Sequence, residues 1–276
     1  MVCCIKTSYF TRHKRATRKS EEACTKFGPG IPKKETLLND VQPGDYQHNV
    51  GFSYGISPDD ENVEWGLCTG TLISENYVLT VAHCVTHYRN PPLMIRAGTI
   101  DMFGEEDRVK PQDVAISDII VHPDYDKRQY KNDLALVKLA KPVRFTSYVQ
   151  PACLYTGKDI PDKMVVTGWG RILQTDHKFS DLLLKTHLVL KDSKSCNDTY
   201  KNKGIVVQAT DFCGLATNTK ICHTGSGSAS FITDEGDDRV RIVGLTSRAL
   251  QCAYIVPNVF VRVSNYLDWI ESIVWP

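Results

Sequence analysis

The sequence lacks several features that would assign it to a broad class at once. Its 33 Lys and Arg residues are balanced by 32 Asp and Glu residues, which leaves a formal net charge of +1. Overall charge therefore gives no support to binding of nucleic acid or another polyanion. No apolar run reaches the roughly 18 residues that a membrane-spanning helix needs, and there is no internal repeat of roughly 20 to 50 residues. What remains is a charge-balanced globular chain of one large domain or two modest ones.

The amino terminus also lacks the features of a secretory leader. The segment from Met1 to Lys6 contains neither an apolar stretch nor a small-residue cleavage site. The chain nevertheless has ten cysteines, an even number that is high for a cytosolic protein and indicates disulfides in an oxidising compartment. Either the protein is cytosolic, or the sequence begins inside a longer secreted chain. The cysteines favour the second interpretation.

Two regions of the chain differ in character. Residues 5–34 are basic and rich in turn formers, which favours a solvated linker, with a docking or cleavage segment as the alternative. From about residue 44, short β-branched apolar runs alternate with turn signals, which is typical of an all-β sandwich or barrel. The clearest expected strands lie within residues 70–73, 77–81, 133–139, 163–168, 240–245 and 259–263. A helix closes the chain, with Ser264 as its cap and with Leu267, Ile270 and Val274 on one face.

Three short motifs contain the residues of a nucleophilic site. His83 follows an apolar run, Asp133 opens another, and Ser226 lies between glycines. Taken singly, each has an ordinary structural explanation: a partly buried histidine, a strand-entry cap and a flexible loop. Together they match a chemistry in which histidine removes the proton of a serine hydroxyl and a buried aspartate orients the histidine. Cys84 and His87 could suggest a metal, but two ligands without a second pair are a weak signal, so no metal or other cofactor is expected.

These motifs resemble those of the trypsin/chymotrypsin-like serine peptidases, and the resemblance covers residues 35–276. The matching segments are Thr80-Val-Ala-His83-Cys84, Asp133-Leu-Ala-Leu136, Thr167-Gly-Trp-Gly170, and Pro257-Asn-Val259 with the closing Trp269-Ile270. The resemblance implies an all-β fold of two antiparallel six-stranded β-barrels plus a C-terminal α-helix. It places the site in the cleft between the barrels, with His83, Asp133 and Ser226 as the catalytic triad.

The same resemblance implies how the cysteines pair and where the chain divides. The implied disulfides are Cys68–Cys84, Cys196–Cys213, Cys222–Cys252 and Cys24–Cys153. Cys3 and Cys4 are left over, and adjacent cysteines before a basic linker look like the end of a clip domain, the small regulatory module of arthropod serine peptidases. We therefore expect a clip-domain remnant with linker and propeptide in residues 1–34 and a peptidase domain in residues 35–276. We also expect the sequence to be truncated at its amino terminus and the protein to be extracellular.

The activation switch of the family departs from its pattern at both ends. In an active member, cleavage creates an N-terminal Ile whose ammonium pairs with the Asp before the nucleophile, and this pair shapes the oxyanion hole. Here Glu35 stands at the Ile position and Gly225 at the Asp position. Thr224 stands at the oxyanion-hole position, where the family has a Gly that lets a backbone N–H point at the oxyanion, and a Cβ there can obstruct that geometry. Two matched losses indicate that the switch is no longer used.

The specificity pocket departs from the family pattern as well. Lys220 stands where trypsin-like members have an Asp, so it would repel a basic substrate side chain, and Asn258 replaces a pocket-lining Gly. Arg248 and Ala249 replace the Trp-Gly that supports the substrate backbone, whereas Ser247 before them is retained. These changes indicate a cleft refitted for something other than peptide cleavage.

Two functions from different classes follow. The first is a secreted, non-catalytic homologue that acts as adaptor or cofactor in an extracellular proteolytic cascade, with cascade peptidases or their substrates as partners. The second is an active trypsin-like serine endopeptidase, supported by the intact triad set. A nucleic-acid binder has little support, because the basic linker lacks interleaved aromatics apart from Tyr9 and Phe10, and no membrane partner is expected. Asn197-Asp-Thr199 is a glycosylation sequon, which is expected in an exposed loop.

Overall fold

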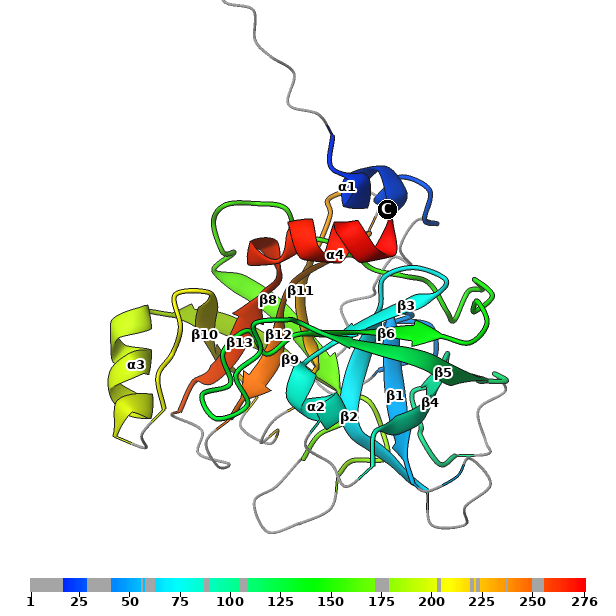
Figure 1. Ribbon diagram of the computed structural model, residues 1–276, viewed down its shortest axis with the longest axis horizontal. Helices are drawn as coiled ribbons and strands as arrows, with labels where there is room; N and C mark the ends of the chain where they lie inside the picture. The colour runs from blue at the N-terminus through cyan, green and yellow to red at the C-terminus, as the bar shows by residue number, and fades with distance from the viewer. Residues whose placement is uncertain are drawn as a thin grey trace, which may run out of the picture.

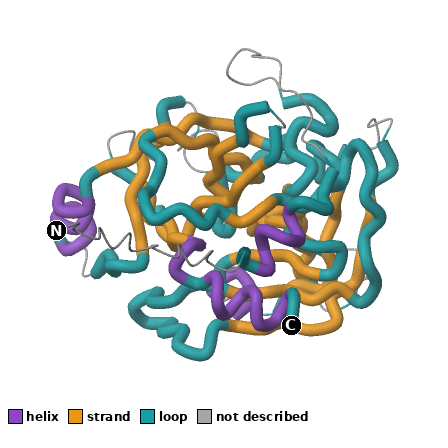
Figure 2. Tube along the Cα trace, turned by 90° about the horizontal axis from the view of Figure 1, so that it is seen from above, coloured by secondary structure: helices purple, strands orange, loops and turns teal. Residues whose placement is uncertain are grey.

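The protein folds into two β-barrels joined by a shared core (Figure 1). The computed structural model describes residues 17–28, 41–55, 57, 63–86, 90–104, 109–171, 179–202, 205–218, 221, 224–236, 238–249 and 256–276. Strands make up most of the regular structure and the helices are short, as the view from above shows (Figure 2). The first barrel is closed in the order β1-β2-β3-β6-β5-β4 by antiparallel pairs. Its strands are β1 (Asn49–Tyr54), β2 (Glu64–Leu72), β3 (Tyr77–Thr80), β4 (Pro92–Ala97), β5 (Gln112–Val121) and β6 (Ala135–Leu139).

The second barrel runs in the order β11-β8-β9-β10-β13-β12 and is closed by pairing of β11 with β12. Its strands are β8 (Lys163–Gly168), β9 (Leu184–Lys191), β10 (Asp211–Ala216), β11 (Ala229–Thr233), β12 (Val240–Arg248) and β13 (Asn258–Arg262). The two-residue strand β7 (Cys153–Leu154) adds to β12 in parallel. The prediction of two antiparallel six-stranded barrels is therefore confirmed, with β7 as a short parallel addition.

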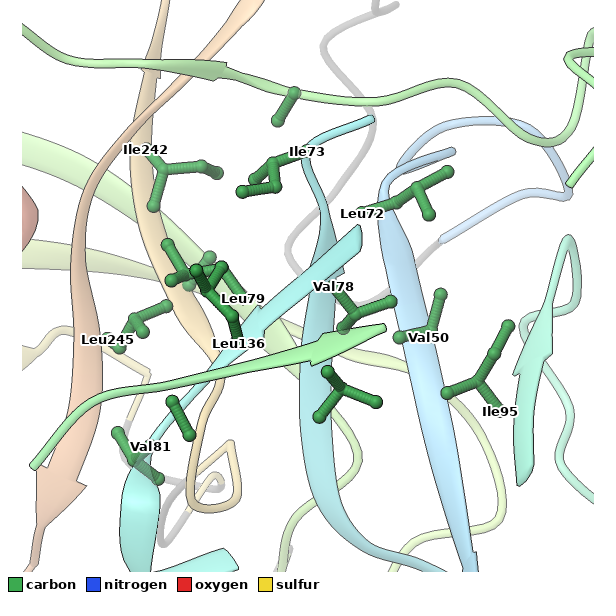
Figure 3. Close-up of a cluster of buried hydrophobic side chains, with 14 of the residues drawn as sticks. Val50, Leu72, Ile73, Val78, Leu79, Val81, Ile95, Leu136, Ile242 and Leu245 are labelled. Carbon is green, nitrogen blue, oxygen red and sulfur yellow. The ribbon is translucent and has the colours of Figure 1, made fainter. Parts of the chain in front are cut away.

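One continuous apolar cluster crosses from barrel to barrel (Figure 3). Leu79 of β3 and Leu136 of β6 lie in the same cluster as Ile242 and Leu245 of β12, and all four side chains are fully buried. Apolar side chains of both barrels are therefore removed from water together in this cluster. The second barrel also buries a smaller cluster of its own, formed by Met164, Val166, Leu188, Phe212, Val243 and Phe260.

The short helices lie outside the barrels. They are α1 (Lys19–Cys24), α2 (Ala82–Thr86), α3 (Ser193–Lys201) and α4 (Leu267–Val274). Among the described residues, none of these helices has the length and apolarity to cross a membrane. The closing helix buries Leu267, Ile270 and Val274 as predicted, but the predicted cap is wrong. Ser264 lies in a preceding 3-10 turn, Val263–Asn265, where its hydroxyl accepts a hydrogen bond from Arg262 Nε at 2.8 Å.

Residues 17–28 are docked on the second half of the chain, in contrast to the solvated linker expected for this stretch. Helix α1 contacts both β7 and α4, and the two helices lie side by side at the top of Figure 1. Glu271 of α4 accepts hydrogen bonds from Arg18 Nε at 3.0 Å and from the Ser20 hydroxyl at 2.5 Å. Cys24 is joined to Cys153 by a disulfide. A charged segment is held here because its side chains find matching partners across the chain.

Candidate active site

His83 is held by the carboxylate of Asp133. The histidine lies on α2, directly after β3, and α2 lies between the strands of the two barrels in Figure 1. Its Nδ1 is 2.7 Å from Oδ2 of Asp133, whose Oδ1 accepts the backbone N–H of His83 at 2.9 Å. An ionised carboxylate only accepts hydrogen bonds, so Nδ1 carries the hydrogen and Nε2 is left as the base. Ser247 donates its hydroxyl to the same Oδ2 at 2.6 Å, which satisfies a carboxylate with no solvent exposure.

The chain before Asp133 turns sharply to deliver this carboxylate. Tyr130 and Asn132 have φ angles of 53° and 51°, the left-handed region that few residues other than glycine adopt. Asn132 is held at both ends of its amide, by the Tyr266 hydroxyl at 3.0 Å and by the Asp124 carbonyl at 2.8 Å. The ring of Tyr130 stands edge-on to His83 at a centroid distance of 5.5 Å. Tyr130 therefore forms one wall beside the candidate base.

Ser226 is presented by a turn that both barrels hold. The flanking Gly225 and Gly227 have φ angles of 95° and 79°. The carbonyl of Ser226 accepts the N–H of Thr69 on β2 at 2.9 Å, and Gly227 donates its N–H to Thr246 on β12 at 2.8 Å. These contacts fix the turn from the first barrel on one side and from the second barrel on the other.

The space above this turn is a cavity of about 460 Å³. Its lining consists of His83, Tyr130, Arg171, Ile205, Gly225, Ser226, Thr246, Ser247, Arg248 and Ala249. The candidate base and the candidate nucleophile thus face one space, with Asp133 behind the base. The Ser226 hydroxyl could act as an activated nucleophile, because the His83 imidazole can take its proton while the Asp133 carboxylate stabilises the resulting imidazolium.

The backbone at Gly225 leaves no room for a side chain. A Cβ built on Gly225 would lie 2.3 Å from the carbonyl oxygen of Trp169. Thr224 is buried beside it, and its carbonyl accepts the Ser228 hydroxyl at 2.5 Å. The turn is therefore closed by backbone packing and neutral hydrogen bonds.

Arg248 is turned inward and paired. Its Nη2 bonds to the carboxylate of Asp211, and its Nη1 donates to the carbonyls of Val206 at 3.1 Å and Gln129 at 3.4 Å. Burial raises the pKa of Asp211 to about 6, and the neighbouring Arg248 offsets only part of that rise. Gln129 belongs to the segment that joins β5 to β6, and Val206 to the segment that joins α3 to β10. Arg248 consequently ties the two barrels together at one end of the cavity.

Comparison with known proteins decides the family. Residues 39–270 match the family model described as Trypsin. The chain belongs to the trypsin family. Serine protease Hayan of Drosophila melanogaster is 31% identical over 94% of this chain and 42% of its own length. Serine protease snk of the same species is 35% identical over 81% of this chain and 52% of its own.

Two further matches agree with these. Phenoloxidase-activating factor 3 of Holotrichia diomphalia is 34% identical over 74% of this chain and 63% of its own. The chain thus spans about half the length of the curated relatives it matches. Among solved structures, the Drosophila Grass clip serine protease of the Toll pathway superposes with a TM-score of 0.73 at 24% identity, covering 88% of this chain and 73% of that one. This likeness supports the fold.

Several residues that the sequence assigned to this trypsin-family site lie elsewhere or outside the described residues. Ser247, Arg248 and Ala249 line the cavity. Asn258 is not part of that lining; it pairs with Gly214 between β13 and β10. The expected site residues outside the described ranges are Glu35, Lys220, Cys222 and Cys252.

Three of the implied disulfides are present in the described residues. They are Cys24–Cys153, Cys68–Cys84 and Cys196–Cys213. The potential ligand atoms of Cys68, His83 and Cys84 lie within 4.8 Å of one another. The two cysteines form a disulfide, however, so neither offers a thiolate to a metal. His87, the other ligand considered, lies outside the described residues.

The sequon at Asn197 lies on a helix, whereas an exposed loop was expected. Asn197 is in the middle of α3 and is half-buried. Its side-chain oxygen accepts the N–H of Val207 at 3.4 Å, which leaves the side-chain nitrogen to carry a sugar. The expectation of an exposed loop was wrong because Asp192 caps a helix here, accepting the Ser195 N–H at 2.7 Å.

Sequence reasoning missed four of the residues that line the cavity: Tyr130, Arg171, Ile205 and Thr246. Arg171 had a usable signal, since it directly follows the Thr167–Gly170 motif that packs against the Ser226 turn. Tyr130 had none, because its left-handed backbone conformation is not visible in its residue type.

Proposed function

We propose that this chain is a secreted, non-catalytic homologue of the trypsin-like peptidases that serves as an adaptor or cofactor in an extracellular proteolytic cascade. The observation that carries the proposal is Gly225, packed against the Trp169 carbonyl with no space for a side chain. By the family resemblance, this position supplies the carboxylate that receives the new N-terminal ammonium. Without that carboxylate, and with Glu35 in place of the Ile, cleavage cannot drive the ion pair that shapes the oxyanion hole.

The oxyanion hole and the cleft give further support. By the family resemblance, Thr224 stands where a Gly lets a backbone N–H point at the oxyanion, and losing one such donor costs about 2.7–4 kcal/mol of transition-state stabilisation. Arg248 replaces the Trp that supports the substrate backbone in the family. Its guanidinium is hydrogen-bonded to Asp211 and to two backbone carbonyls. Because these bonds hold the Arg248 side chain, it does not take over the supporting role of that Trp.

The cascade role rests on the relatives. One is named Phenoloxidase-activating factor 3, and the structural neighbour is described as a clip serine protease of the Toll pathway. The disulfides of this chain suit an oxidising extracellular environment. Partners would be peptidases of the cascade or their substrates. We also propose that residues 1–34 are a clip-domain remnant with linker and propeptide, that residues 35–276 are the peptidase domain, and that Asn197 carries a glycan.

The second candidate function is an active serine endopeptidase. It is favoured by the 2.7 Å contact of His83 with Asp133 and by the cavity that His83 shares with Ser226. Two relatives are also named serine proteases.

Active-site labelling separates the two candidates. The protein is cut after Lys34 with an immobilised lysyl endopeptidase, which is then removed, and the product is exposed to a fluorophosphonate probe. A Ser226→Ala variant processed in the same way gives the background, and processed trypsin gives the positive signal. We expect labelling at the Ser226→Ala background. Strong labelling of Ser226, together with peptide hydrolysis, would establish the active endopeptidase instead.

A further inference from the structure

The cavity above Ser226 has two basic residues in its lining. They are Arg171 and Arg248, and no Asp or Glu is among the described lining residues. Two acids lie behind lining residues. Asp133 is fully buried and accepts hydrogen bonds from His83 and Ser247, and Asp211 is buried and paired with Arg248. The described lining therefore consists of basic and neutral residues, with the Arg248 charge already paired with Asp211.

Both arginines retain donor capacity. The Nε atoms of Arg171 and Arg248 are buried, and neither has a hydrogen-bond acceptor among the described residues. Leaving a buried donor unsatisfied is unfavourable, more so for a charged group. An acceptor supplied by a ligand would remove that cost for an Nε atom that it reaches.

The two arginines differ in how their charge is balanced. Arg248 is fixed by Asp211 and by two carbonyls, so its charge has a local counterion. Arg171 has no carboxylate partner within the described part of the chain, and its guanidinium lies 5.0 Å from the centre of the Phe179 ring. An aromatic face orients a guanidinium while leaving its edge free to bind an anion. Arg171 is thus the charge that a ligand could neutralise.

We propose that this cavity binds the carboxylate side chain of a glutamate or aspartate, presented by an extended segment of a partner protein. The guanidinium fork matches a carboxylate in geometry and forms charge-assisted hydrogen bonds with it. A peptide segment is a better fit than a small free acid, because Tyr130, Ile205 and Ala249 give the cavity apolar walls that the backbone and neighbouring side chains of a segment would cover. This inference rests on the proposed function, since it gives the chemistry of the partner that the non-catalytic cleft would hold.

Binding of three matched peptides tests the proposal. Fluorescein-labelled heptapeptides of alanine and glycine, with glutamate, glutamine or lysine at the centre, are titrated into the full chain and followed by fluorescence polarisation. Free glutarate serves as the small-acid competitor. We expect the glutamate peptide to bind about tenfold more tightly than the glutamine peptide, with the lysine peptide weakest and glutarate a poor competitor. The preference should shrink in high salt, which screens partly exposed charges.

Variants assign the preference to Arg171. Arg171→Gln should remove the difference between the glutamate and glutamine peptides, whereas Arg171→Lys keeps the charge and should retain part of it. Arg144→Gln is the matched control, because Arg144 is exposed and is not part of the cavity lining. Thermal midpoints of all variants are compared with the parent. If Arg171→Gln fails to fold, the proposal is still tested by the affinity ranking of the three peptides on the parent protein and on Arg171→Lys.

Each outcome bears on the proposal. Equal binding of the glutamate and glutamine peptides, tighter binding of the lysine peptide, or no binding of any peptide at millimolar concentration would overturn it. If glutarate inhibits with an affinity equal to that of the glutamate peptide, the proposed protein segment would be wrong and the ligand would be a small free acid. Mass spectrometry of the peptides after incubation tests the proposed function separately: cleavage would contradict a non-catalytic role while leaving the charge ranking readable.

Discussion

At the scale of single residues, the pairing of Arg248 with Asp211 couples the cavity wall to pH. The side chains of Arg248 and Asp211 are 6% and 1% exposed, so each charge has lost its water and is stabilised by the other. Burial raises the pKa of Asp211 from its ordinary value of 3.8 to about 6. Because the folded pKa lies above the unfolded one, this carboxyl contributes most to stability below about pH 4. The contribution is lost as pH rises towards 6 and the folded protein must release a proton that the unfolded chain has already lost.

Replacing Arg248 should therefore destabilise the fold in a pH-dependent way. Arg248→Met leaves Asp211 buried without a cation, and we expect a loss of about 3–5 kcal/mol in the free energy of unfolding at pH 8. At pH 5 the loss should be smaller, because Asp211 is then protonated in the folded parent as well and needs no cation. Urea unfolding of parent and variant at both pH values measures the difference, and exposed Arg144→Met is the control. A loss that does not change with pH would show that Asp211 is not the group involved.

The close approach at Gly225 makes a second prediction about a single residue. Gly225→Ala must place a methyl group 2.3 Å from the Trp169 carbonyl in a backbone with φ of 95°. Gly236→Ala is a matched control, since its φ is 94° and a Cβ there meets nothing within 4 Å. The control should lose only the roughly 1–2 kcal/mol of left-handed strain, whereas Gly225→Ala should lose clearly more. Equal losses in thermal unfolding would mean that the Ser226 turn shifts freely.

At the scale of elements, α1 is fastened to the second half of the chain by covalent and ionic contacts. Beyond Cys24–Cys153, Glu21 pairs with Arg241 of β12 at 3.1 Å, and Arg241 also binds Asp234 at 2.7 Å. The Thr156 hydroxyl donates to the same Glu21 carboxylate at 2.7 Å. These partly buried networks keep α1 in one position even though only a short helix is involved.

Cleavage between α1 and the first barrel should therefore leave the protein in one piece. A lysine-specific peptidase offered the native protein should cut at Lys33 or Lys34, because the turn-rich basic segment joins two anchored parts. We expect the fragments to separate on a denaturing gel only after reduction. A Cys24→Ser variant, cut in the same way, should separate without reductant. Separation of the parent fragments without reductant would contradict the disulfide.

At the scale of the whole molecule, sequence reasoning reached the fold because many short signals agreed. The strand expected within 163–168 coincides with β8, and the buried face of the closing helix contains the three expected residues. What could not be predicted depends on contacts between distant segments. The docking of α1 requires Glu271 and Arg241, more than 200 positions away. The inward turn of Arg248 requires Asp211, and nothing in the local sequence of Arg248 points to that partner.

The candidate site shows the same division between residues. His83, Asp133 and Ser226 could be named because their motifs are local, and the structure gathers them around one cavity. Tyr130 could not be named in the same way, because it reaches that cavity through a left-handed turn, whereas the motif that precedes Arg171 could have pointed to it.

The shared core predicts that the two barrels unfold together. Leu245 of β12 is fully buried in the cluster that contains Leu79 and Leu136 of the first barrel. Leu245→Ala should cost about 2–5 kcal/mol, and with the disulfides intact the near- and far-ultraviolet circular dichroism transitions should still coincide. Amide hydrogen exchange gives the sharper measurement: the slowest amides of β3 and of β10 should accelerate by the same factor, because both exchange through one global opening. Leu182→Ala is the control, since Leu182 is 54% exposed and should change neither strand. Acceleration confined to β10 and its neighbours would mean that each barrel is a separate cooperative unit, despite the apolar side chains that they share.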